Sequence, residues 1–210
     1  MKKESKYFTI EYSNEAKTYI TKLLDKIDIE AKKILDFFEI QNIDNKFYVK
    51  LIPTKKEFSH LIEEVIHFKD NEYGIGFVNN KIMYCLSFND YKNTFYSFYN
   101  FDNFISTIIH EFVHSCHQLK TNNKSSIRCI SEGLACYLSN QLCKKDFVFN
   151  ASIDDIVNDK YIDYDNYYLI VKYIFDNYDK KYCDRIIYDK DFARSEIVNI
   201  YNSFKESIRK

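Results

Sequence analysis

The sequence has little glycine or proline, no tryptophan and no long apolar run. Its 210 residues include three glycines and one proline, and we find no low-complexity tract or flexible linker in it. No stretch approaches the ~18 apolar residues of a membrane-spanning helix. The first twelve residues, MKKESKYFTIEY, carry lysines but no apolar core of a secretory signal behind them. We therefore expect a cytoplasmic protein with no membrane partner.

An excess of charge of one sign is also absent. The chain has 30 Lys and Arg residues against 31 Asp and Glu residues, a net charge of -1. Such a balance gives no indication of the basic surface that binds a nucleic-acid backbone, so no nucleic-acid partner is expected. The apolar fraction of 46% and charged fraction of 29% are those of a globular protein. We expect a monomer with a single domain over residues 1–210.

The six cysteines form no CxxC pair, which disfavours a zinc ribbon. In a reducing compartment we expect them to be buried thiols rather than disulfides. They are Cys85, Cys116, Cys129, Cys136, Cys143 and Cys183.

The hydrophobic pattern predicts strands and helices in the first part of the chain and helices in the last. Strands are expected at 7–12 and 46–52, and a hairpin over 73–87 that turns at Asn79-Asn80. Helices are expected from Ser13 or Asn14 to about residue 35, from Thr54 to about His67, over 101–119 and over 126–144. Residues 90–100 are expected to form a loop, and 153–210 to be entirely helical. This order predicts an α+β fold, with an N-terminal subdomain over about 1–119 and a helical C-terminal subdomain over 120–210.

The segment His110-Glu111-Phe112-Val113-His114 has the spacing of a catalytic zinc site. Residues four apart lie one turn apart on the same side of a helix, so His110 and His114 can both present a ring nitrogen to one ion. Glu111 beside them supplies a carboxylate that can act as general base. Apolar residues cover the rest of this helix, and burying two histidines and a carboxylate without partners is costly. A metal ion would supply the partner.

A catalytic zinc site needs a third protein ligand and one open position. Glu132 stands eighteen positions after His114, in the segment SEGLACY of the next predicted helix. HEFVH followed by this Glu-Gly-Leu-Ala-x-Tyr segment resembles the gluzincin metallopeptidases, and more narrowly their M1-aminopeptidase-like and peptidase MA-like branches. The strand and helix order of roughly 7–179 is similar to that family, although only the two helix motifs are diagnostic.

The resemblance implies a small zincin-like domain with one catalytic zinc ion. It assigns His110, His114 and Glu132 as zinc ligands and Glu111 as general base and acid. It also implies a downstream tyrosine that stabilises the oxyanion, at the first position of a Y-x-x-G segment. Tyr164 aligns with that position, but Tyr167 stands where glycine is expected. The nearby tyrosines Tyr161, Tyr167 and Tyr168 stay open as alternatives.

The family's G-x-M-E-N segment, which anchors a free amino terminus, is absent here. A zinc peptidase of peptide or protein substrates is therefore expected to be an endopeptidase rather than an aminopeptidase. The region 74–85 resembles the edge strand along which gluzincins bind an extended peptide, and Gly76 would allow close backbone approach. A plain hairpin is an equally good interpretation.

Three further alternatives are open from the residues alone. His117 continues the face of His110 and His114, but a position at the rim or behind the ligands is favoured over a ligand role. Cys136 lies one turn from Glu132 and is the rival third ligand, because thiolate binds zinc well. His60 and His67 are expected to be ordinary surface histidines. From another functional class, a non-catalytic zinc-stabilised module that binds peptides or proteins would share the same fold.

Overall fold

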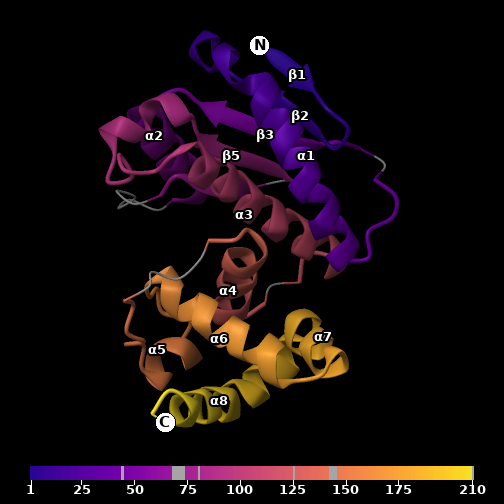
Figure 1. Cartoon of the computed structure of the whole chain (residues 1–210), viewed down its shortest axis with the longest axis vertical. Helices are drawn as coiled ribbons and strands as arrows, with labels where there is room; N and C mark the ends of the chain where they lie inside the picture. Colours follow the sequence, from indigo (N-terminus) through magenta and orange to yellow (C-terminus); the bar gives the residue numbers. More distant parts are fainter. Residues whose placement is uncertain (44, 68–73, 80, 125, 142–145, 210) are drawn as a thin grey trace. The chain divides into compact units, whose positions relative to one another are not determined.

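The protein is described here by a computed structural model that covers residues 1–43, 45–67, 74–79, 81–124, 126–141 and 146–209 (Figure 1). The chain divides into two compact units, Met1–Cys116 and His117–Lys210. The division falls three residues before the predicted subdomain boundary, within the helix that carries HEFVH. The first unit contains a mixed sheet with helices, and the second unit is helical in its described part. The predicted α+β class is confirmed, whereas the single domain stays a prediction.

The sheet of the first unit has the strand order β1-β2-β3-β5-β4. Its three central strands run parallel, and β1 and β4 lie antiparallel at the two edges. The predicted strands and hairpin are confirmed, except that the second turn residue, Asn80, lies outside the described residues. The strands are β1 (Lys2–Glu4), β2 (Phe8–Glu11), β3 (Phe47–Ile52), β4 (Gly76–Asn79) and β5 (Ile82–Leu86).

The helices of the first unit mostly follow the prediction. Thr54 caps its helix as expected, because its hydroxyl accepts the backbone N–H of Glu57. Ser13 instead precedes a short 3₁₀ turn and makes no side-chain cap bond, and the predicted loop begins with a 3₁₀ turn that includes Asp90–Asn93. These two details of the prediction were wrong. The elements are η1 (Asn14–Thr18), α1 (Ile20–Phe37), α2 (Lys55–Ile66), η2 (Phe88–Asn93) and α3 (Phe101–Lys120).

One face of the sheet is covered by α1 and α3, which run side by side in front of the strands (Figure 1). The Phe112 ring of α3 lies 5.1 Å from the ring of Phe8 and 4.7 Å from that of Phe47, both in edge-to-face geometry. Phe112 is fully buried, and truncating such a residue to alanine costs about 3–5 kcal/mol. This packing fixes the helix that carries the two histidines against β2 and β3.

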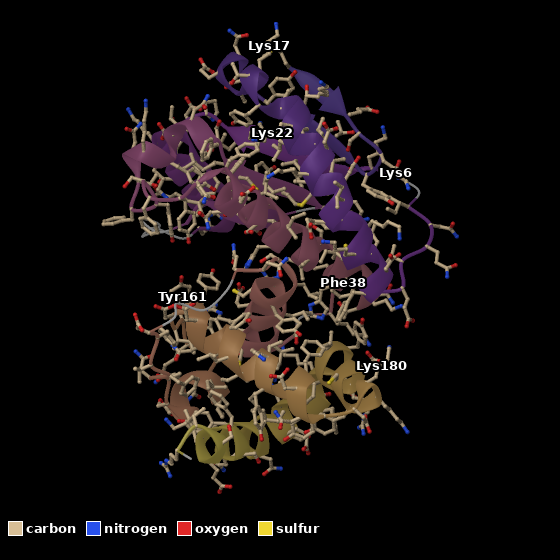
Figure 2. All side chains as sticks on the ribbon, viewed as in Figure 1. Lys6, Lys17, Lys22, Phe38, Tyr161 and Lys180 are labelled. Carbon is tan, nitrogen blue, oxygen red and sulfur yellow. The ribbon has the colours of Figure 1, made fainter. Side chains whose placement is uncertain are left out.

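Polar groups lie on the outside of the same unit. Figure 2 labels the exposed lysines Lys6, Lys17 and Lys22 there, together with the buried Phe38 at the end of α1. The described cysteines are all buried thiols outside any disulfide, as predicted, and Cys143 lies outside the described residues. No helix within the described ranges combines the length and the apolarity that a membrane crossing requires.

The second unit is built on its own apolar core, to which Ile130, Tyr167, Ile170, Ile186 and Ile200 contribute. The helical prediction for residues 153–210 is confirmed for the described part, with short connections between helices. The elements are α4 (Arg128–Leu138), α5 (Ile153–Val157), α6 (Tyr164–Asn177), α7 (Lys180–Tyr188) and α8 (Lys190–Ser207).

The helix predicted over 126–144 is shorter than expected, because α4 ends at Leu138. Asn140 takes a left-handed backbone conformation with φ 57°, which asparagine tolerates better than most residues. The N–H of Gln141 then bonds the carbonyl of Cys136 at 3.0 Å and closes the last turn. The sequence does not predict this helix end, because no glycine or proline follows Leu138.

Candidate metal centre

The helix that carries HEFVH begins at a reciprocal cap. Asn100 Oδ1 accepts the N–H groups of Asp102 and Asn103, and Asn103 Oδ1 accepts the N–H of Asn100. These bonds satisfy N–H groups that a helix start leaves without internal partners. The apolar side chains then recur every three or four residues, which buries one side of α3 and fixes the direction of its polar residues.

His110 and His114 lie on successive turns of α3, as predicted. Their Nε2 atoms are 3.1 Å apart, and the ring centroids are 4.8 Å apart. His110 is 6% exposed and His114 is half-buried. Two nitrogen ligands at about 2.05 Å from a tetrahedral zinc ion stand about 3.3 Å apart. The observed separation is close to this value, so the two rings fit one zinc ion.

Glu111 is buried against the edge strand of the sheet. It is 6% exposed, and its carboxylate rests on Gly76 of β4, where an added β-carbon would lie 2.6 Å from Oε1. Cys85 is the cross-strand partner of Gly76 and lies close enough to the same carboxylate for its charge to act on the thiol. Burial raises the pKa of the Cys85 thiol well above its usual range, and the charge of Glu111 raises it further. Cys85 is therefore a neutral thiol beside the carboxylate.

Glu132 lies half-buried in the middle of α4. Two contacts within the second unit hold this helix. Asp159 Oδ1 accepts the N–H of Arg128 at 2.8 Å, at the first turn. Gly133 allows close packing on α6, since an added β-carbon there would lie 2.5 Å from both the Tyr167 carbonyl oxygen and Val171 Cγ2. The glycine of the SEGLACY segment thus has a packing role.

The ligand atoms of His110, His114 and Glu132 all lie within 4.8 Å of one another, and they form a possible metal-binding group among the described residues. The donor set is two imidazole nitrogens and one carboxylate oxygen, which is the set of catalytic rather than structural zinc sites. These are the three residues predicted as ligands, and their role as ligands stays a prediction.

The predicted oxyanion tyrosine, Tyr164, is the first residue of α6 and is 38% exposed. The ring of Tyr161 packs edge-on against it, with centroids 5.8 Å apart. Desolvation raises the pKa of Tyr161, a hydrogen bond with Tyr164 lowers it, and the charge of Glu132 raises it. Tyr161 thus lies close enough to Glu132 of α4 for the charge to act on it, and Tyr164 lies beside Tyr161.

The other two tyrosine alternatives are buried. The hydroxyl of Tyr167 donates to the carbonyl of Lys160 at 2.9 Å and accepts the N–H of Ile162 at 3.2 Å, so it is engaged in holding the loop before α6. Tyr168 is 9% exposed and packs near Tyr137. Tyr161 and Tyr164 are better placed than these two for a role towards a substrate.

The remaining candidates have structural contacts. The ring of His117 is buried and donates from Nε2 to the carbonyl of Ile187 at 2.9 Å. Cys136 is buried and its thiol donates to Gln141 Oε1 at 3.7 Å. His60 and His67 are exposed, as predicted, and His60 pairs with Glu64 one turn away.

Two residues near the site have roles that the sequence does not predict. In the sequence Gly133 is only one position of a motif, and no pattern predicts the contact of Gly76 with Glu111. A signal was present, because the chain has only three glycines and two of them lie beside residues of the motifs. No protein-family model, curated protein or solved structure matches the chain. The family resemblance therefore rests on the HEFVH and SEGLACY segments alone.

Proposed function

We propose that the chain is a zinc-dependent peptidase of the zincin type that cleaves peptide or protein substrates internally. His110, His114 and Glu132 would hold the ion, with one coordination position open. The observation that supports this most is the proximity of their ligand atoms, within 4.8 Å, with the buried Glu111 beside His110 on the same helix. A purely structural zinc site needs no such carboxylate.

Zinc, when bound at such a site, lowers the pKa of water to about 7 and polarises a carbonyl group. The side chains of this chain would do the rest. Glu111 would take a proton from the attacking water and deliver it to the nitrogen of the leaving amine. Tyr164, whose side chain is partly exposed, would donate a hydrogen bond to the developing oxyanion.

The edge strand β4 supports a peptide substrate. Among the described strands β4 pairs with β5 alone, so its outer edge can bind an extended peptide by strand addition. Gly76 on this strand touches the Glu111 carboxylate, which would bring the peptide next to the base. The absent G-x-M-E-N segment favours internal cleavage over removal of a terminal residue.

The decisive experiment compares the wild type with Glu111→Gln, which keeps the size of the side chain and removes the base. Zinc content and cleavage of a mixed peptide library are measured for both. We expect one zinc per chain in both proteins and cleavage by the wild type alone. Zinc binding without cleavage by either protein would favour the non-catalytic binding module. A wild type that binds no zinc would reject both functions.

A second comparison tests the third ligand. Glu132→Ala should abolish stoichiometric zinc binding, whereas Cys136→Ser should retain it. Both side chains belong to α4, so the pair controls for effects on the helix. The reverse result would assign Cys136 as the ligand.

A further inference from the structure

We propose that Gly76 is a positioning residue for the Glu111 carboxylate. Because Gly76 has no side chain, it leaves the space against the edge strand that the general base occupies. This inference rests on the proposed peptidase function. It assigns a role in catalysis to a strand residue that offers no functional group of its own.

The contact is close along the whole end of the Glu111 side chain. A β-carbon on Gly76 would lie 2.6 Å from Oε1 and 3.0 Å from both Cδ and Cγ. Real β-carbons do not approach other heavy atoms so closely, so an alanine at this position would push the carboxylate aside. The base would move, while the backbone of both elements could stay.

Space, and not backbone conformation, is what this glycine provides. Within the described part of the chain no glycine has a positive φ, so alanine can adopt the same backbone at residue 76. The effect of a methyl group would therefore act on Glu111 directly.

The backbones of the strand and the helix are both held in place at this contact. In the strand, Gly76 pairs with Cys85 of β5. The residues just before it are held by two hydrogen bonds. Leu86 N donates to the carbonyl of Ile75 at 2.8 Å, and Lys55 Nζ donates to the carbonyl of Gly74. The helix is held by Phe112, which packs on Phe8 and Phe47. The side chain of Glu111 is the part that must shift.

The first test measures kcat, KM and zinc content of Gly76→Ala, with His60→Ala as the control. The control removes an exposed side chain of α2 that has no proposed part in zinc or peptide binding. We expect Gly76→Ala to retain one zinc per chain and KM, and to lose about tenfold or more in kcat, since small displacements of catalytic groups are costly. His60→Ala should stay within about twofold of the wild type. A kcat of Gly76→Ala within that range would overturn the inference.

The second test needs no activity and uses the metal-free full-length chain. Gly76→Ala is made in the wild type and in Glu111→Ala, and the thermal midpoints of the four proteins form a double-mutant cycle. We expect Gly76→Ala to lower Tm by about 2 °C or more in the presence of Glu111 and by less than about 1 °C in its absence. If the Tm shifts of the two single variants simply add in the double variant, the positioning role of Gly76 is rejected. A double variant that fails to fold would reject it as well.

The two tests separate the inference from the proposed function. If the wild type binds zinc and cleaves no peptide, the peptidase proposal fails, and the cycle alone then decides whether Gly76 controls the place of Glu111. If the wild type cleaves and Gly76→Ala cleaves equally well, the peptidase proposal stands and the positioning role is rejected.

Discussion

The Nε2 atoms of His110 and His114 face each other 3.1 Å apart on successive turns of α3. At this distance one neutral ring can donate its N–H to the other. In the proposed zinc complex both Nε2 lone pairs would be directed to the ion, and the ring N–H groups would lie on the Nδ1 atoms.

Replacing one of the two rings should remove the ion. For His114→Ala we expect zinc affinity to fall about 100-fold or more, because about 10–16 kcal/mol of zinc binding is shared among few ligands. Zinc content after dialysis against a competing chelator measures this loss. His60→Ala removes an exposed imidazole on α2 and should keep the zinc content of the wild type. A His114→Ala protein that still holds one zinc per chain would contradict the assignment.

The close contact of α4 and α6 predicts a large effect of a small side chain. Gly133→Ala places a methyl 2.5 Å from the Tyr167 carbonyl oxygen, which belongs to a helix backbone. We expect a loss of about 2 kcal/mol in the free energy of unfolding, measured in urea, since overpacking costs ~1–3 kcal/mol. Arg128→Ala on the same helix serves as control and should change stability by less than about 0.5 kcal/mol.

Two exposed tyrosines compete for the oxyanion role, and kinetics can separate them. If Tyr164 donates to the oxyanion, Tyr164→Phe should lower kcat about 100-fold, leave KM nearly unchanged and retain zinc. Tyr161→Phe should lower kcat less, because the Tyr161 ring packs on Tyr164 and its hydroxyl bonds to it. The opposite order of the two effects would transfer the role to Tyr161.

The sequence predicts those parts of the fold whose causes are local. The Thr54 cap follows from a hydroxyl three residues before Glu57, and the two histidines follow from helical spacing. Strand β1 was not predicted, because Lys2, Lys3 and Glu4 have no apolar alternation. Its pairing comes from β2, which supplies the hydrogen-bond partners. Edge strands of this kind are charged, as is common where a sheet borders water.

Contacts between distant residues account for what the sequence could not predict in the candidate site. Glu111 and Gly76 are 35 positions apart in the printed sequence, and their contact depends on how α3 lies on the sheet. The contact of Gly133 with Tyr167 likewise depends on how α4 packs on α6. No local sequence pattern around either residue predicts the other as its partner. The motif residues were identifiable because their chemistry requires a fixed spacing, whereas the residues that make room for them follow no spacing rule.

The buried hydroxyl of Tyr167 predicts how stability depends on alkaline pH. Burial raises the pKa of Tyr167 to about 12, above the ~10 of a tyrosine in an unfolded chain. The folded protein therefore keeps this proton more tightly. The resulting stability is fully present below pH ~10 and is lost as pH rises towards about 12.

Tyr167→Phe tests this assignment. At pH 7 we expect a loss of about 1–2 kcal/mol, because the Ile162 N–H and the Lys160 carbonyl lose their hydroxyl partner. Between pH 10 and 12 the wild type should lose about 1–2 kcal/mol more than the variant, so the gap between the two closes. Urea unfolding of both proteins at pH 7, 10 and 11 measures the difference in their free energies of unfolding. Taking the difference between wild type and Tyr167→Phe cancels the titration of the other tyrosines. A gap that stays constant over this range would show that the Tyr167 proton is not held by the fold.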